Sequence, residues 1–249
     1  MDTRYWGPSG WRLLHLISFS TVPKQKDLCA FFNTLPYVLP CKYCRKSFSE
    51  NISADPVESA DSISKWLWRI HNKVNDKLRK QHLCKIEDPT FQSVKSVYEE
   101  RLSTGCTRTV FEGWEFLFSI AEGHPLSREG RKSTPIYGYP PVESLTDLEK
   151  NRWNILPPED RLVYYNDFWK ILPSVLPFKE WSEAWKKGVP DNRRDLFKHL
   201  WSNRCHMEKQ LELINSTTYN SLCRELKTYK SECSKSVRGK TCRKKRNRS

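Results

Sequence analysis

The sequence predicts an all-α protein, and three observations support this fold class. Apolar residues recur at intervals of three and four along most of the chain, most clearly over residues 63–78. No segment shows the alternation of apolar and polar residues that is typical of a strand. Pro, Gly and short polar side chains stand between the periodic segments, where helices begin and end. The 249 residues suffice for one large domain or two small ones.

The first hundred residues predict five consecutive helices. The third begins at Cys41, directly after Pro40, and the fourth begins after Asp61 or Ser62, either of which can cap it. Asp88 and Pro89 start the fifth helix, and Gly105 follows its end. In order, the expected helices are 10–21, 26–38, 41 onward, 63–78 and 89–102.

The second half is also predicted to be helical. Residues 124–141 hold four Pro and two Gly, which indicates a loop or linker. The helices expected on either side of it are 110–122, 160–172, 178–187 and 191–214. From this pattern we expect a first domain over 1–106, a second helical domain over 107–223 and a basic flexible tail over 224–249.

Two stretches of the chain resemble each other. Residues 31–44 read FFNTLPYVLPCKYC and residues 168–181 read FWKILPSVLPFKEW, so that aromatic residues replace both cysteines. Residues 11–18 are more loosely similar to 114–121, with Phe118 in place of His15, and 66–73 to 196–203. The simplest interpretation is a duplicated helical unit whose second copy has lost its chemistry, and chance similarity between helical segments is the alternative.

The charge and hydrophobicity of the chain limit the classes of function that we expect. The net charge is +14, and residues 224–249 carry eleven Lys or Arg against two Glu. Such a segment is a solvated arm or a binding site for nucleic acid and other polyanions. We find no apolar run long enough for a transmembrane helix and no secretory signal, so we expect the protein to act where it is made.

The motif Cys41-Lys42-Tyr43-Cys44 is the strongest chemical signal in the sequence. A CxxC motif is either half of a zinc site or a redox pair, and no second Cys or His pair stands at zinc-finger spacing, so we expect no metal. A helix that starts at this motif offers unpaired amide groups and the positive end of its dipole, which stabilise a thiolate. The position therefore favours dithiol redox chemistry.

Polar residues on apolar helix faces indicate where electrons from the pair would go. His15 follows Trp11 by four residues and so shares its face, and His71, Val74 and Asn75 form a stripe on the fourth helix. A buried histidine with ordinary partners is the simpler interpretation of His15 alone. Together with the CxxC motif, these residues indicate a flat heteroaromatic ligand held between helices.

The segments WGPSGWRLLH, FFNTLPYVLPCKYC and WLWRIHNKVNDKLRK together resemble the helical FAD-linked sulfhydryl oxidases of the Erv/ALR type over about residues 5–106. The resemblance implies a four-helix bundle that clasps FAD, with a short fifth helix across it. It implies Cys41 and Cys44 as the redox pair. By position, the implied FAD-binding residues are Gly7, Trp11, His15, His71, Asn72, Val74, Asn75, Lys77 and Lys80.

The resemblance also implies a reaction. A thiol of the substrate protein attacks Cys41, taken as the more accessible cysteine; Cys44 passes electrons to FAD; and dioxygen accepts them, giving hydrogen peroxide. Cys84 and Cys106 are the implied structural disulfide, although their separation looks long for the family. Shuttle cysteines in the family often form CxC or CxxC pairs, a pattern that the tail lacks; Cys223, Cys233 and Cys242 are the shuttle candidates.

The fusion of an oxidase domain to a second helical domain resembles the sulfhydryl oxidases of large DNA viruses of eukaryotes. This resemblance implies the host cytoplasm or the virion as the location, and either a dimer or a pseudo-dimer within one chain. Two other functions stay open on sequence grounds, a nucleic-acid-binding structural protein and a zinc-stabilised adaptor.

Overall fold

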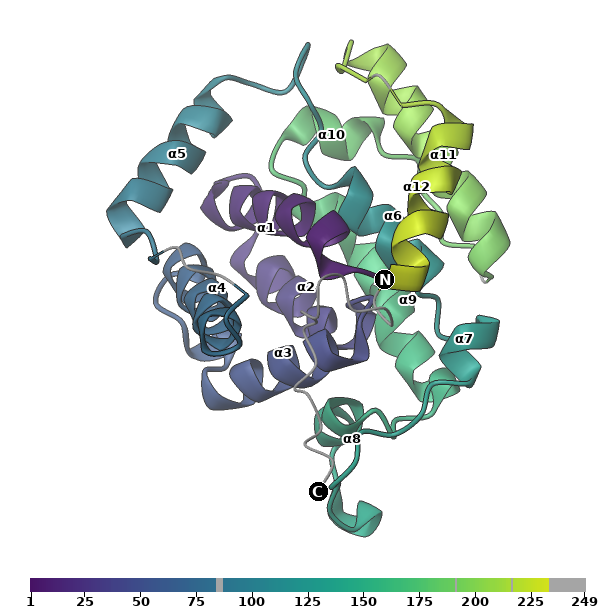
Figure 1. Cartoon of the computed structure of the whole chain (residues 1–249). Coiled ribbons are helices and arrows are strands. Elements are labelled where there is room, and N and C mark those ends of the chain that lie inside the picture. Colours follow the sequence, from purple (N-terminus) through teal and green to yellow (C-terminus); the bar gives the residue numbers. More distant parts are fainter. Residues whose placement is uncertain (84–86, 191, 216, 233–249) are drawn as a thin grey trace.

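The computed structural model is helical throughout the residues that it describes, which are 1–83, 87–190, 192–215 and 217–232 (Figure 1). The all-α prediction is confirmed. The first half contains α1 (Thr3–Phe19), α2 (Gln25–Val38), α3 (Lys42–Ala54), a 3-10 turn (Val57–Ser59), α4 (Ile63–Lys80) and α5 (Phe91–Ser103). Among the described helices, none has the length and apolar character needed to cross a bilayer.

The second half begins at α6 and wraps around one side of the first (Figure 1). Its helices are α6 (Trp114–Glu122), α7 (Arg128–Arg131), α8 (Asp147–Trp153), α9 (Pro158–Val175), α10 (Lys179–Ala184), α11 (Arg193–Gln210) and α12 (Tyr219–Glu232), with a 3-10 turn at Val142–Ser144. Helices α8 and α12 have no counterpart in the sequence predictions, and α7 lies within the expected linker.

Two predicted boundaries differ from the structure. Helix α1 begins at Thr3 instead of residue 10, because the Asp2 carboxylate caps it by accepting a hydrogen bond from the Arg4 amide, and Trp6 is buried against Phe116. Residues 224–232, expected in the basic tail, belong to α12. Leu226 is buried there, so this part of the tail is packed against the protein.

The core is continuous between the halves, and the main contacts between them run along three helix pairs, α2 with α9, α1 with α6 and α3 with α8. The rings of Phe31 and Phe168, which occupy equivalent places in the two similar stretches, stack at 5.3 Å. Helix α4 packs on α1, and in the second half α11 packs on α6. Each half therefore covers the other with two corresponding helices, α1 and α2 in the first half and α6 and α9 in the second.

Several contacts between the halves are reciprocal. A Cβ at Gly10 would lie 3.0 Å from Phe116, and a Cβ at Gly113 would lie 2.5 Å from Leu13. Gly10 precedes Trp11 as Gly113 precedes Trp114, and the sequence similarity aligns Leu13 with Phe116. Contacts in which residue i meets j and j meets i are the property of a two-fold interface.

A second reciprocal pair lies at the ends of the same helices. The Ser20 hydroxyl donates to the Pro177 carbonyl at 2.7 Å, and a Cβ at Gly123 would lie 3.6 Å from the Cα of Pro40. Pro40 and Pro177 are equivalent in the two similar stretches, and Ser20 and Gly123 are equivalent in the extended alignment of α1 with α6. The two halves thus meet through a second set of contacts between positions that correspond in the two similar stretches.

We predict that Gly10→Ala destabilises the protein by about 1–3 kcal/mol, because the added methyl group must displace the buried Phe116 ring. Gly7→Ala in the same helix is the matched control, since a Cβ there meets nothing within 4 Å and alanine gains about 0.5–1 kcal/mol of helix propensity. Urea denaturation of both variants measures the difference. Equal free energies of unfolding would contradict the close approach of α1 and α6.

Candidate functional site

A cluster of aromatic and histidine rings joins α1 to α4. The His15 Nε2 and His71 Nδ1 atoms are 3.0 Å apart, at hydrogen-bond distance. The indole of Trp11 stacks on the His71 ring with centroids 3.9 Å apart. Trp11 and His15 share a face because four residues separate them, as the sequence predicts. Of the predicted FAD-binding residues, these three are in mutual ring contact.

Helix α5 completes the ring cluster, a role that the sequence analysis did not assign to it. Tyr98 lies 5.0 Å from His15 and 5.7 Å from Phe19, measured between ring centroids, and Phe91 lies 5.9 Å from Phe19. Phe91 and Tyr98 are seven residues apart and therefore on one side of the helix. That spacing was the available signal, but nothing in it specified α1 as the partner.

Burial keeps both histidines neutral. Loss of solvation lowers the pKa of His15 to about 3, with a smaller contribution from His71. It lowers the pKa of His71 to about 4, against a smaller opposing effect of Asp88. In the neutral pair, one ring donates its N–H group to the other. The cluster is thus an uncharged surface at neutral pH.

One buried polar atom of the ring cluster has no hydrogen-bond partner among the described residues. The His15 Nδ1 atom is buried and makes no hydrogen bond in the structure. Buried polar atoms are normally paired, so an unpaired nitrogen between aromatic walls fits a ligand that is flat and carries hydrogen-bonding atoms. An isoalloxazine or adenine ring has this chemistry, and the residues present fit FAD.

The other predicted FAD-binding residues surround this cluster with varying contacts. Asn75 donates from Nδ2 to Asp88 at 3.0 Å, which ties α4 to the segment before α5. Lys80 is exposed and pairs with Asp76 at 2.6 Å. Four other residues on α1 and α4 are half-buried: Gly7, Asn72, Val74 and Lys77.

The CxxC motif lies at the start of α3, as predicted. Cys41 is the N-cap residue, and its carbonyl accepts from the amides of Cys44 at 3.0 Å and Arg45 at 2.9 Å. The first-turn amides and the helix dipole favour thiolate at this position. The expectation that Cys41 is the more accessible cysteine is wrong: it is 7% exposed, whereas Cys44 is half-buried, because parts of the second half cover Cys41.

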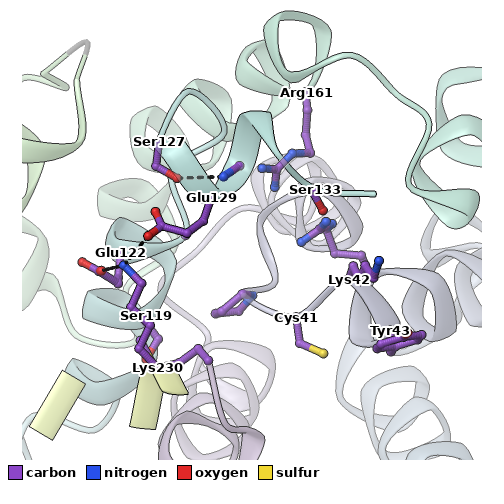
Figure 2. Close-up of a pocket in the computed structure, with 15 residues that line it drawn as sticks. Cys41, Lys42, Tyr43, Ser119, Glu122, Ser127, Glu129, Ser133, Arg161 and Lys230 are labelled. Carbon is purple, nitrogen blue, oxygen red and sulfur yellow. Dashed lines mark hydrogen bonds and ion pairs between the residues drawn. The ribbon is translucent and has the colours of Figure 1, made fainter. Parts of the chain in front are cut away.

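Cys41 lines a cavity of about 320 Å³ that both halves of the chain build (Figure 2). Figure 2 shows Cys41 and Lys42 on one side of the cavity, with Ser133 beside Lys42, Arg161 above them and Glu122 and Lys230 on the far side. Much of the lining belongs to α6, α7, α9 and α12 of the second half: Ser119, Glu122, Gly123, Glu129, Gly130, Arg161 and Lys230. The sequence analysis did not place these residues near the CxxC motif.

Comparisons with known proteins match the segment that carries both features. Residues 8–97 match the model of the Erv1 / Alr family. This match covers 90 of the 249 residues, and we call residues 8–97 the Erv1/Alr segment. A comparison with solved structures gave no match.

The Erv1/Alr segment is similar to the mitochondrial FAD-linked sulfhydryl oxidase ERV1 of Saccharomyces cerevisiae, with 36% identity over 86 residues, which cover 32% of this chain and 46% of that protein. It is 32% identical over 85 residues to a probable FAD-linked sulfhydryl oxidase of Acanthamoeba polyphaga mimivirus, covering 30% of this chain and 59% of the viral protein. The chain thus spans about half the length of these curated relatives.

The remaining predicted cysteines are only partly within the described residues. Cys106 is buried, which raises the pKa of its thiol to about 11 together with a hydrogen bond to Glu180, but its predicted partner Cys84 lies outside the described residues. Cys223 is half-buried on α12. Cys233 and Cys242 also lie outside the described residues. Within the described part of the chain, no three His, Cys, Asp or Glu side chains gather as metal ligands.

We predict that the free energy of unfolding falls as the pH drops from about 6.5 toward 4. Because the native pKa values of His15 and His71 are about 3 and 4, the unfolded chain takes up protons first, at its ordinary histidine pKa. Each such histidine contributes a slope of up to about 1.4 kcal/mol per pH unit. Urea denaturation at several pH values measures the slope.

His15→Phe should reduce this slope by about the contribution of one histidine. The remaining slope would come from His71 and the buried His124. The exposed His206→Gln on α11 is the control and should leave the slope unchanged. A slope that His15→Phe does not alter would show that His15 is not held neutral.

Proposed function

We propose that the protein is an FAD-linked thiol oxidase that forms disulfide bonds in protein substrates. The observation that carries the proposal is that one Erv1/Alr segment holds both a CxxC pair at a helix start and a neutral histidine–aromatic cluster that fits a flavin. The relatives named FAD-linked sulfhydryl oxidases support the same activity.

The residues that would hold FAD are Trp11, His15 and His71 in the ring cluster, with Tyr98 closing it and Asn72, Val74 and Asn75 beside it on α4. By the family resemblance, Gly7, Lys77 and Lys80 would lie near the polar parts of the cofactor. Bound FAD supplies a two-electron acceptor that can be reoxidised by dioxygen, with hydrogen peroxide as the product.

The cysteine pair performs the thiol exchange. A substrate thiolate that enters the cavity lined by Cys41 attacks the Cys41 sulfur of the oxidised pair, and Cys44 leaves as a thiolate. A second substrate thiolate then attacks the substrate sulfur, which releases Cys41 and forms the substrate disulfide. The substrate loses two electrons and two protons to the pair. The α3 amides and the Arg45 guanidinium stabilise the thiolates that form in these steps.

The second half would act as a degenerate copy that replaces a partner subunit. The reciprocal contacts between α1 and α6 and the stacking of Phe31 on Phe168 support a two-fold arrangement of duplicated units. The face of α1 and α2 that a second subunit would need is covered by α6 and α9. We therefore propose a pseudo-dimer within one chain.

Aromatic side chains fill the position in the second half that corresponds to the ring cluster. Trp114 and Phe118 lie 6.0 Å apart, much as Trp11 and His15 do at 6.1 Å. Trp201, aligned with His71, lies 6.4 Å from Phe118, and the Arg204 guanidinium packs over the rings of Trp114 and Trp201. The second half thus has no histidine at the two positions that correspond to His15 and His71, so we propose that it binds no flavin.

A thiol shuttle from the C-terminal segment is part of the proposal. Lys230 of α12 lines the cavity that holds Cys41, and Cys233 follows Lys230 by three residues, a reach of at most about 11 Å. Cys223 lies two turns earlier on α12, and the three shuttle candidates, Cys223, Cys233 and Cys242, stay predictions. Nucleic-acid binding by the basic segment and a location in host cytoplasm or virion stay predictions.

We expect the purified protein to consume oxygen when dithiothreitol is added, and Cys44→Ser to lower this rate at least about a thousandfold, because no cysteine can then accept and release the electrons. Cys205→Ser, at an exposed position on α11, is the control and should keep the wild-type rate. An oxygen electrode measures all three proteins. Oxygen uptake that survives in Cys44→Ser would contradict the assignment of the pair.

We predict that the protein is a monomer of about 29.5 kDa in solution, because its own second half occupies the face available for dimerisation. Sedimentation equilibrium over a range of concentrations measures the mass. A stable mass of twice this value would contradict the pseudo-dimer.

A further inference from the structure

Two buried arginines line the cavity beside Cys41, one from each half of the chain. Arg45, in the first turn of α3, is 5% exposed, and Arg161, in the first turn of α9, is 7% exposed. Burial lowers the pKa of both, and Arg45 lowers that of Arg161 further because the two positive charges repel each other. Buried charges of one sign are costly unless a counter-charge accompanies them.

Among the described residues, no carboxylate pairs with either arginine. The two acidic side chains that line the cavity, Glu122 and Glu129, are engaged elsewhere. Lys230 binds Glu122 at 2.6 Å and Glu129 at 3.2 Å, and Arg193 also pairs with Glu122. Apart from the thiolates that Cys41 and Cys44 form during the exchange, the described lining of the cavity therefore offers no negative charge to Arg45 and Arg161.

Both arginines also have N–H groups that donate no hydrogen bond within the described residues. Arg45 donates to the Leu39 carbonyl at 3.1 Å and to Asn154 at 2.6 Å, and Arg161 donates to the Tyr37 carbonyl at 3.0 Å. A guanidinium carries five N–H donors. The Arg45 Nε group is buried without a partner, as is the hydroxyl of Ser119 on the opposite wall of the cavity.

We propose that this cavity is an anion subsite that binds a carboxylate of the thiol substrate while the substrate sulfur attacks Cys41. The inference rests on the proposed oxidase function and adds the substrate class, which is a protein dithiol flanked by acidic residues. Guanidinium groups bind carboxylates through paired, charge-assisted hydrogen bonds. A cavity of about 320 Å³ has room for an acidic side chain beside the sulfur.

The carboxylate stays chemically unchanged in this scheme. Its role is to hold the substrate so that a thiolate faces Cys41, and to neutralise the two buried guanidinium groups during the exchange. The two electrons and two protons still come from the substrate thiols and go to the Cys41–Cys44 disulfide, as in the proposed reaction. Figure 2 shows the Arg161 side chain extending into the cavity that Cys41 lines from the other side.

A comparison of two alkylating reagents tests the subsite without requiring oxidase activity. Iodoacetate is an anion and iodoacetamide is its neutral analogue, so the ratio of their rates at one cysteine reports the local preference for a carboxylate, whatever the pKa of that thiol. We expect this ratio to be roughly tenfold higher at Cys41 than at the exposed Cys205 of the same reduced protein. Peptide mass spectrometry after timed alkylation measures both sites.

Arg161→Gln should lower the ratio at Cys41 to that at Cys205. Lys170→Gln removes the same charge from the exposed face of α9 and is the matched control, which should keep the wild-type ratio. If Arg161 served only to hold the Tyr37 carbonyl, its loss would change both alkylation rates together and leave the ratio unaltered. Equal ratios at Cys41 and Cys205 in the wild-type protein would overturn the proposal, even if Arg161→Gln failed to fold.

Dithiol peptides distinguish this inference from the oxidase proposal. We expect oxygen uptake with a CxxC peptide flanked by Glu to show a kcat/KM roughly tenfold above that of the same peptide flanked by Lys. The kcat/KM for a small thiol acid, 3-mercaptopropionate, should exceed that for the thiol amine cysteamine in the same way, because the carboxylate alone binds the subsite. Equal rates for both peptides would overturn the subsite and leave the oxidase standing. No uptake with either peptide or with dithiothreitol would overturn the oxidase itself.

Discussion

The close approach of α1 to α6 is the constraint on which the rest of the structure depends. It requires glycine at Gly10 and Gly113, since any side chain at either position would enter the space of Phe116 or Leu13. This approach brings the end of α6 near Pro40, so that Ser119 and Glu122 reach the cavity beside Cys41. This helix contact thus joins the two halves, together with the contact of α2 with α9, and also places part of the cavity wall beside the CxxC motif.

The two halves have different roles: the first half holds the residues proposed for the chemistry, and the second half lines the cavity beside Cys41. The first half keeps the CxxC pair and the neutral His15–His71 pair, whereas the second half has bulky apolar rings and Arg204 in the corresponding place. What the second half contributes instead is the wall of the cavity, including Arg161. In the proposed pseudo-dimer, the second unit would have no cofactor site of its own and would still be needed, because it buries one face of the first half and lines the approach to Cys41.

Local sequence patterns predicted the helices with strong apolar periodicity and placed the CxxC motif at a helix start. They missed α8, whose buried Asn151 donates to the carbonyl of the distant Pro36, and α12, whose buried Leu222 and Leu226 stand in a segment rich in basic residues. Likewise, periodicity could place Tyr98 on a helix face but could not bring it to His15. The cavity was beyond sequence reasoning because residues more than a hundred positions apart, such as Arg45 and Arg161, line it together.

We propose that one half of the chain binds a flavin between α1 and α4 and that the other half binds none. The most direct measurement is the amount of FAD released on denaturation, per mole of purified chain, after saturation with FAD and removal of the excess. The account predicts one FAD per chain in the wild-type protein. A chain that binds no FAD would contradict the site at His15 and His71, and a value of two would contradict the degenerate second half.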